Sequence, residues 1–94
     1  MSRVISRTPV FKRDFKREKK GQHRTTVEAD LKAIVELLCN DIPLEPRNHD
    51  HALSGSWADF RDCHIKPDLV LIYRKPTENT LELVRIGSHS ELGI

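Results

Sequence analysis

The spacing of apolar residues changes along the chain and divides it into a helical half and a strand-forming half. After residue 25 the apolar positions recur every three or four residues, which is typical of a helix with one buried face. These positions are Val27, Leu31, Ile34, Val35 and Leu38. From residue 52 onward the pattern favours strands, which we expect near 57–65, 69–74 and 80–86.

The N-terminal segment carries the signals of a short strand followed by two helices. Residues 2–7 read as the strand. Thr8 and Pro9 fit the N-cap and the first position of a helix, because proline lacks an amide N–H that the first turn leaves unpaired anyway. Thr25 and Glu28 have the spacing of a capping box, which predicts the start of the second helix.

The expected order of elements is β-α-α-β-β-β, which defines an α+β fold. Two N-terminal helices would pack on one face of a small, mostly antiparallel sheet, and the other face would stay at least partly free. With 94 residues, 37% of them hydrophobic and 32% charged, the sequence fits one soluble domain over residues 1–94. Because so small a core leaves little room for a deep pocket, we expect a site on the sheet surface.

Positive charge is concentrated in the first quarter of the chain. Residues 1–24 hold nine Lys and Arg against two acidic residues, a net +7, and the other 70 residues carry −5. Such asymmetry favours a polyanionic partner, although a solvated helix face would give the same pattern. The basic residues of the first helix that could contact such a polyanion are Lys12, Arg13, Lys16, Lys19 and Lys20.

Other sequence features point to a cytoplasmic protein. No apolar run reaches the roughly 20 residues that span a bilayer, and the N-terminus lacks the apolar stretch of a signal peptide, so no membrane partner is expected. Cys39 and Cys63 match no zinc spacing and are too few for a disulfide-built scaffold. We expect both thiols to be reduced and buried.

Histidines gather near the ends of the predicted strands. Strand alternation puts Asp62 and His64 on one face and Cys63 on the other, so apolar Cys63 would face the helices and His64 the open side. Asp68 follows a tight turn, and His89 follows the last strand. Two more imidazoles precede the first of these strands, His49 and His51.

These residue types fit the cleavage of RNA. The 2′-hydroxyl must lose a proton as it attacks the phosphate, and the 5′-oxygen must gain one as it leaves. Histidine titrates near neutrality and serves either task. An arginine fork stabilises the extra negative charge of the transition state, and Arg85 and Arg61 are candidates. Spacing alone leaves two alternatives open: surface histidines without a role, and a metal site built from His49, His51 and His64 or Asp68.

Four motifs in the C-terminal half resemble the YafQ branch of the RelE-type toxins. That branch reads D-H-x-L-x-G-x-W, then [YF]-R-[DE]-x-H-[VIL]-x-P-D, then L-[IV]-Y, and ends in R-x-G-[ST]-H. The matching stretches here are Asp50–Trp57, Phe60–Asp68, Leu71–Tyr73 and Arg85–His89. The resemblance is dense over residues 50–92 and looser before them.

The resemblance implies an mRNA interferase of a type II toxin–antitoxin pair. Such toxins cut mRNA in the ribosomal A site by 2′-hydroxyl attack, without a metal or other cofactor. The family's catalytic residues fall on His51, His64, Asp68 and His89, and its phosphate-facing arginine on Arg85. The implied partners are the ribosome, its mRNA and an acidic antitoxin, and the free toxin is expected to be a monomer.

One position departs from the family pattern. YafQ-type toxins commonly carry a phenylalanine four residues after the last histidine, where it helps to hold an mRNA base. Gly93 occupies that position here. This departure supports an alternative function, a catalytically degenerate protein of the same fold that binds RNA or an antitoxin without cutting.

Overall fold

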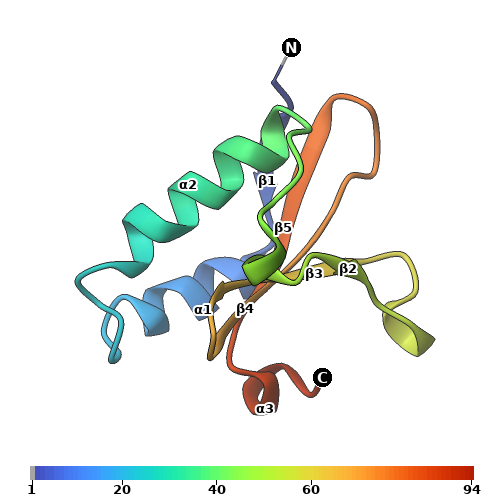
Figure 1. The fold of residues 1–94 in the computed structure, drawn as a ribbon. Helices are drawn as coiled ribbons and strands as arrows, with labels where there is room; N and C mark the ends of the chain where they lie inside the picture. Colours follow the sequence, from blue (N-terminus) through green and yellow to red (C-terminus); the bar gives the residue numbers. More distant parts are fainter. Residues whose placement is uncertain (1) are drawn as a thin grey trace.

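Five strands form one mixed sheet with the order β1-β5-β4-β3-β2 in the computed structural model, which describes residues 2–94 (Figure 1). The strands are β1 (Val4–Arg7), β2 (His51–Ala52), β3 (Arg61–Lys66), β4 (Leu69–Arg74) and β5 (Thr80–Gly87). The helices are α1 (Pro9–Glu18), α2 (Val27–Cys39) and α3 (His89–Leu92), and short 3-10 turns span Pro46–Asn48 and Gly55–Trp57. In the described part of the chain, no helix is long and apolar enough to cross a membrane.

The predicted α+β order is confirmed, with two short elements added. β1 pairs in parallel with β5, and the other strand pairs are antiparallel. The strand β2 and the helix α3 were not predicted, because two and four residues are too short to show a period. The strand expected from residue 57 begins only at Arg61, since a 3-10 turn occupies Gly55–Trp57.

The start of the first helix was predicted correctly, and that of the second was not. Thr8 caps α1, and its hydroxyl accepts a hydrogen bond from the amide of Phe11 at 2.9 Å. The capping box expected at Thr25 and Glu28 is absent from the described chain, because α2 begins at Val27 with Thr26 as N-cap and no side-chain cap.

The helix-covered face of the sheet carries the main core. Its fully buried members come from α1, α2 and every strand from β3 to β5, and include Phe11, Val27, Cys63, Leu71 and Leu81. Complete burial of an apolar side chain of this size contributes about 1.5–3 kcal/mol. Both cysteines are buried and free, as expected.

The opposite face is only partly covered. Val70 and Ile72 of β4 are fully buried there, under Leu92 of α3 and under Trp57 and Phe60 from the segment before β3. We call this side of the sheet the open face. It is the surface on which the candidate site lies.

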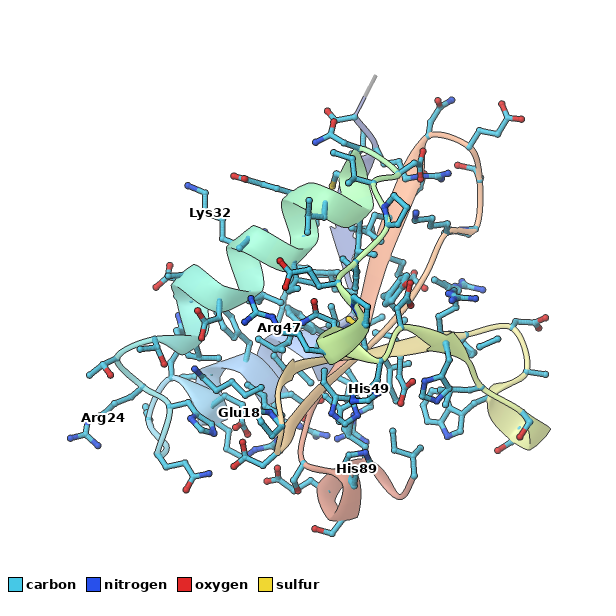
Figure 2. All side chains as sticks on the ribbon, in the orientation of Figure 1. Glu18, Arg24, Lys32, Arg47, His49 and His89 are labelled. Carbon is cyan, nitrogen blue, oxygen red and sulfur yellow. The ribbon has the colours of Figure 1, made fainter. Side chains whose placement is uncertain are left out.

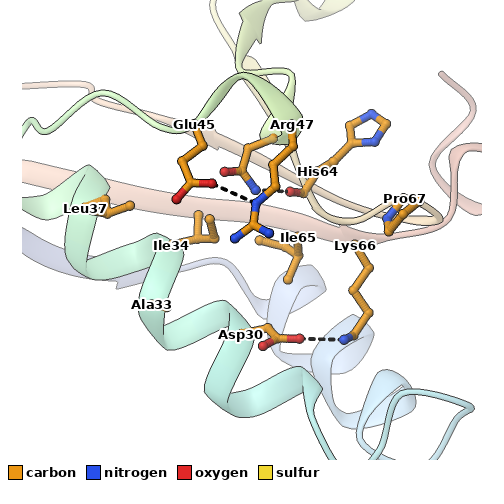
Figure 3. A pocket seen from close by; sticks show the side chains of 11 residues that line it. Asp30, Ala33, Ile34, Leu37, Glu45, Arg47, His64, Ile65, Lys66 and Pro67 are labelled. Atoms are coloured by element: carbon orange, nitrogen blue, oxygen red, sulfur yellow. Dashed lines mark hydrogen bonds and ion pairs between the residues drawn. The ribbon is translucent and has the colours of Figure 1, made fainter.

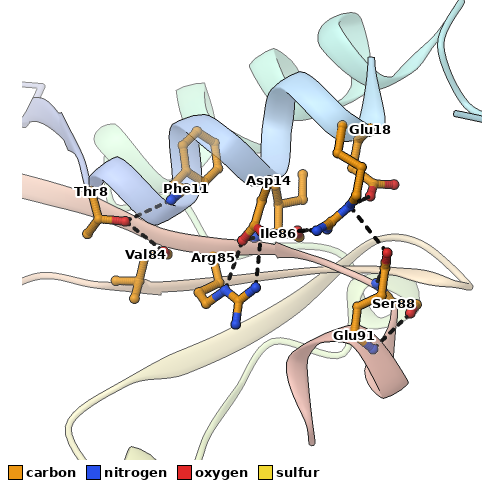
Figure 4. Close-up of polar contacts among 10 residues, drawn as sticks. Thr8, Phe11, Asp14, Glu18, Val84, Arg85, Ile86, Ser88 and Glu91 are labelled. Carbon is orange, nitrogen blue, oxygen red and sulfur yellow. Dashed lines mark hydrogen bonds and ion pairs between the residues drawn. The ribbon is translucent and has the colours of Figure 1, made fainter. Parts of the chain in front are cut away.

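Helix α1 lies along the part of β5 that β1 does not reach (Figure 4). β1 pairs with β5 only as far as Leu83. Beyond it, the Thr8 hydroxyl donates to the carbonyl of Val84 at 2.8 Å, and Asp14 Oδ2 accepts from the amide of Ile86 at 3.3 Å. A guanidinium nitrogen of Arg17 donates to the carbonyl of Ile86 at 3.1 Å. Side chains of α1 therefore satisfy edge groups of β5 that would otherwise need another strand.

Candidate active site

Strand register arranges the candidate residues of the open face in two rows. In the first row, His51 of β2 lies opposite Asp62, Asp62 opposite Ile72 of β4, and Ile72 opposite Arg85 of β5. Residues that oppose one another across a sheet share a face. The basic and acidic groups of this row thus come from three strands, β2, β3 and β5, and lie on the same side as buried Ile72 of β4.

A break in the register places Arg85 on the open face. Tyr73 pairs with Leu83, but its neighbour Ile72 pairs with Arg85, so Val84 is an extra residue in β5. Simple alternation would put Arg85 on the same face as Leu83, which belongs to the helix-side core. The bulge turns the arginine to the side of Ile72 and Val84.

The second row brings two of the predicted catalytic histidines together. His64 lies opposite Val70, and Val70 lies opposite Gly87, two residues before His89. The ring centroids of His64 and His89 are 5.1 Å apart. His49 approaches His64 from the loop before β2, also at 5.1 Å between centroids (Figure 2). The structure therefore gathers three imidazoles, with those of His49 and His89 on either side of His64.

His89 is fixed at the first position of α3 by a capping box. The Ser88 hydroxyl accepts from the amide of Glu91 at 3.1 Å, and the Glu91 carboxylate accepts from the amide of Ser88 at 2.8 Å. Leu92 then anchors the short helix in the open-face cluster. These contacts hold the exposed ring of His89 beside that of His64.

The surroundings of His64 favour its neutral form. Burial lowers the pKa of the His64 imidazole from its usual value of 6.5, and the nearby His89 and His49 lower that pKa further. Asp62 acts in the opposite direction without reversing the shift. At neutral pH the imidazole of His64 is therefore able to accept a proton.

His51 lies between two acceptors. Its Nδ1 is 2.7 Å from the carbonyl oxygen of His49, so Nδ1 carries a proton in this arrangement. Its Nε2 is 3.0 Å from Oδ1 of Asp62. That oxygen is buried and has no aligned hydrogen-bond donor among the described residues, so the short distance is a contact rather than a formed hydrogen bond. Asp62 restrains the orientation of the His51 ring.

Arg85 is held by the buried carboxylate of Asp14 (Figure 4). Its Nε donates to Oδ2 of Asp14 at 2.9 Å, and its Nη2 donates to Oδ1 at 3.0 Å. The hydrogen bonds that Arg85 donates to Asp14 raise the pKa of the guanidinium, so Arg85 is charged throughout the physiological range. Its side chain remains 24% exposed.

Two predicted residues have their hydrogen-bond partners away from the histidines of the open face. Asp68 at the β3–β4 turn accepts hydrogen bonds from Gln22 and His23 in the loop between α1 and α2. Arg61 donates to Asp50 at 3.3 Å and to the hydroxyl of Tyr73 at 3.4 Å, and Tyr73 belongs to the helix-side core. The structure therefore ties Asp68 to a distant loop and places Arg61 on the face opposite His64.

Of the basic residues predicted to bind phosphate, Lys12, Arg13 and Lys16 are exposed on α1. Lys19 and Lys20 are exposed just after the helix ends at Glu18, and the ammonium of Lys19 lies 5.0 Å from the ring centroid of Phe15. The opposite side of the same helix carries Asp14, which bonds to Arg85. One short helix thus presents cations to solvent on one side and holds Arg85 on the other.

Sequence reasoning missed Asp14 and His23 as partners of site residues. Asp14 is one of two acidic residues in a basic helix, and His23 lies in a polar turn, so neither stands out by spacing. An acidic residue on the apolar side of α1, three positions after Phe11, was the available signal for Asp14. The pairing of Asp14 with Arg85 depends on the bulge in β5, however, and so could not be predicted from the sequence.

A hollow of about 460 Å³ lies between α2 and β3 on the other side of the sheet (Figure 3). Ile34, Leu37 and Ile65 line it, and an ion pair of Asp30 with Lys66 closes one side. The ring of His64 points away from it. His64 thus borders the hollow without its ring entering it.

Comparison with known proteins agrees with the motifs. The sequence profile of the family described as "Bacterial toxin of type II toxin-antitoxin system, YafQ" matches residues 3–93. The mRNA interferase toxin YafQ of Escherichia coli strain B / BL21-DE3 is 37% identical over 91 residues, which cover 95% of this chain and 98% of that protein.

Solved structures extend the similarity to the fold. A copper-bound mutant toxin from Helicobacter pylori has a TM-score of 0.85 and 37% identity, covering 98% of this chain and 99% of that one. The E. coli DinJ–YafQ toxin–antitoxin complex matches with a TM-score of 0.82 and 35% identity, covering 98% of both chains. In residues 2–94, no three His, Cys, Asp or Glu side chains are arranged to hold a metal ion.

Three observations agree. The family profile matches nearly the whole chain, the fold is similar, and the sequence carries four motifs of the family. This protein belongs to the YafQ family of bacterial toxins of type II toxin–antitoxin systems.

Proposed function

We propose that this toxin is an mRNA interferase that cuts mRNA in the ribosomal A site by metal-independent acid–base catalysis. The observation that carries the proposal is the pair of His64 and His89, 5.1 Å apart on the face that also carries Arg85. Two relatives with the same fold are named mRNA interferases, which supports the same reaction class here.

In the proposed reaction the 2′-oxygen of a ribose attacks the adjacent phosphorus, and the bond to the 5′-oxygen breaks. His64 accepts the 2′-proton, because its lowered pKa leaves the ring neutral at pH 7. His89 donates a proton to the leaving 5′-oxygen. The products are a 2′,3′-cyclic phosphate and a 5′-hydroxyl, and each proton transfer contributes on the order of 10²–10⁴-fold.

Arg85 and His51 would act from the first row. The guanidinium fork of Arg85 binds the nonbridging oxygens, whose negative charge grows in the transition state. His51, oriented by Asp62 and the His49 carbonyl, is the second candidate to accept the 2′-proton, because its Nε2 is the unprotonated nitrogen when Nδ1 donates to that carbonyl. Asp68, at the β3–β4 turn, is also a proposed catalytic residue. Its hydrogen bond with His23 must break before its carboxylate can reach the mRNA.

The proposed partners follow from the charge of α1 and from a relative. Exposed cations on this helix would contact ribosomal RNA phosphates, which position a protein without reading sequence. Because the E. coli relative forms a complex with DinJ, we propose an acidic antitoxin that covers part of the same basic surface. The free toxin would be a monomer in the cytoplasm, where ribosomes translate.

Growth arrest and cleavage mapping test the proposal. We expect His64→Ala and Asp68→Ala each to relieve arrest while circular dichroism and antitoxin binding stay unchanged, and the surface variant Glu78→Gln to remain toxic. Wild-type toxin should create new mRNA 5′ ends in the A site of programmed ribosomes, and excess EDTA, with magnesium restored to the ribosomes, should not abolish them. Equal toxicity of a His64/Asp68 double variant would sink the proposal.

One observation favours the degenerate alternative. Gly93 stands where the family commonly has phenylalanine, and it adopts a left-handed φ of 72° as the C-cap of α3. That conformation favours glycine over an aromatic residue. If wild-type toxin binds programmed ribosomes but yields no new 5′ ends, this alternative replaces the interferase.

A further inference from the structure

Asp14 is a buried carboxylate whose partners all lie at the edge of β5 or on α1 itself. Its side chain is 0% exposed, although it lies in a strongly basic helix. It accepts two hydrogen bonds from Arg85, one from the amide of Ile86 and one from Arg17 at 3.2 Å. Burial of a carboxylate is costly unless such partners compensate, and here they do.

The geometry of the Asp14–Arg85 pair leaves a defined part of the guanidinium free. A guanidinium has five N–H groups, and Asp14 takes the Nε–H and one Nη2–H. Both Nη1–H groups and the second Nη2–H remain available. They form a second edge of the fork, which suits two oxygens of one phosphate.

The charge balance around Asp14 also preserves the cation. Arg17 shares the carboxylate with Arg85, so Asp14 does not neutralise Arg85 alone. Arg17 in turn lies 3.2 Å from Glu91 of α3, the residue that closes the capping box below His89. One network of ion pairs therefore joins α1 to Arg85 and to the helix that carries His89.

From this geometry we infer that Asp14 is a positioning residue, which holds the free edge of the Arg85 guanidinium toward the scissile phosphate without touching the RNA. The inference rests on the proposed function, because it assigns the phosphate to Arg85. An arginine on a strand has many rotamers, and two bonds to a buried carboxylate select one of them before substrate binds.

Asn is the informative replacement at this position. The amide oxygen of Asp14→Asn can still accept from the amide of Ile86, so the contact between α1 and β5 is kept. The same oxygen can still accept from Nε of Arg85, but the NH₂ group takes the place of Oδ1 and would face Nη2 of Arg85 and Nη1 of Arg17, and two donors cannot bond to each other. Asp14→Asn therefore breaks one of the two bonds that orient Arg85 and removes the negative charge of its partner, while disturbing the helix as little as the chemistry allows.

The test is a double-mutant cycle on single-turnover cleavage of mRNA by programmed ribosomes. We expect Asp14→Asn to lower the rate at saturating toxin by about 10–100-fold, with half-saturation changed less than about twofold, because misplacement of a catalytic group costs on this order. Adding Asp14→Asn to Arg85→Ala should cost no further rate, since Asp14 acts through the arginine that is already missing. A merely structural role would lower the rate in both backgrounds by the same factor.

Glu82→Gln is the matched control. Glu82 lies on the same strand and pairs with Arg74, so it also changes one ion-paired carboxylate to an amide. We expect its cleavage rate to stay within about twofold of the wild type, as rates of variants that touch no site group do.

Each outcome bears on the inference. A wild-type rate for Asp14→Asn, or equal losses in both backgrounds, overturns it while leaving the proposed function in place. A wild type that cuts no message overturns the proposed function and the role of Asp14 in cleavage with it. Should Asp14→Asn fail to fold, NMR of the wild type decides: a slowly exchanging Arg85 Nε–H signal is expected, and a rapidly exchanging one contradicts the inference.

Discussion

His64 and His89 lie with their ring centroids 5.1 Å apart, although 25 positions in the sequence separate them. The hairpin of β3 and β4 and the return of β5 bring them together. The proximity of two ionisable rings has measurable consequences for each.

Replacing His49 should raise the pKa of His64. Burial is the main cause of the lowered pKa of His64, but the positive charges of His89 and His49 contribute. His49→Gln removes one of these charges and keeps a polar side chain of similar size. An NMR titration of the His64 ring should therefore show a higher pKa in this variant, and an unchanged or lower value would contradict the assigned cause.

His64 should also make the stability of the fold depend on pH. Because its pKa is lower in the folded than in the unfolded state, the unfolded chain binds more protons in the range between the lowered value and 6.5. Stability contributed by His64 is thus present above 6.5 and is lost as the pH falls through that range. The free energy of unfolding by urea should rise less from pH 5 to pH 8 in His64→Gln than in wild type.

Asp14 predicts a second loss of stability at lower pH. Burial would raise the pKa of this carboxyl, but hydrogen bonds from Arg85 and Ile86 and the charge of Arg17 lower it below the ordinary 3.8. Its contribution is therefore present above about 3.8 and lost as the pH falls through the folded-state pKa. In wild type, acid unfolding followed by circular dichroism should therefore include a loss of stability caused by protonation of Asp14. That loss should be missing in Asp14→Asn.

Arg85→Lys should retain the charge of the site and lose most of its activity. A lysine ammonium cannot form the two-pronged contact with Asp14 and a second one with phosphate. We expect cleavage at saturating toxin to fall by about 10²–10³-fold, the usual cost of one transition-state donor. A rate within a few-fold of wild type would show that charge alone is sufficient.

Gly87→Ala should loosen the junction of α1, β5 and α3. A Cβ at this position would meet Arg17 Nη2 at 2.9 Å, Glu91 Oε1 at 3.2 Å and Leu92 Cδ2 at 3.3 Å. Because the nearest atom ends a flexible side chain, Arg17 can move, at the expense of its bond to the carbonyl of Ile86. We expect the free energy of unfolding to fall by about 1–2 kcal/mol, within the range for overpacking, and denaturant unfolding measures it directly.

The sequence predicted most of the fold and the side of the sheet on which His64 lies. Periodicity located α2 and β4, and alternation put Cys63 in the core and His64 opposite it. The sequence could not show on which face Arg85 lies, because the bulge at Val84 reverses alternation in β5 and no glycine or proline marks that bulge. It also could not show that Asp68 bonds to His23, because that contact joins segments 45 residues apart.

Helix α1 has one more consequence for how this toxin meets other chains. Where α1 covers β5 with side chains rather than with a paired strand, the sheet cannot be extended by another polypeptide. Among the described strands, the places left for backbone pairing are the outer edge of β1 and, on the opposite side, the outer edge of β2 with the part of β3 after Asp62 that β2 does not pair. A partner that adds a strand must therefore bind at one of the two far sides of the molecule, and the cationic helix beside Arg85 stays accessible to RNA.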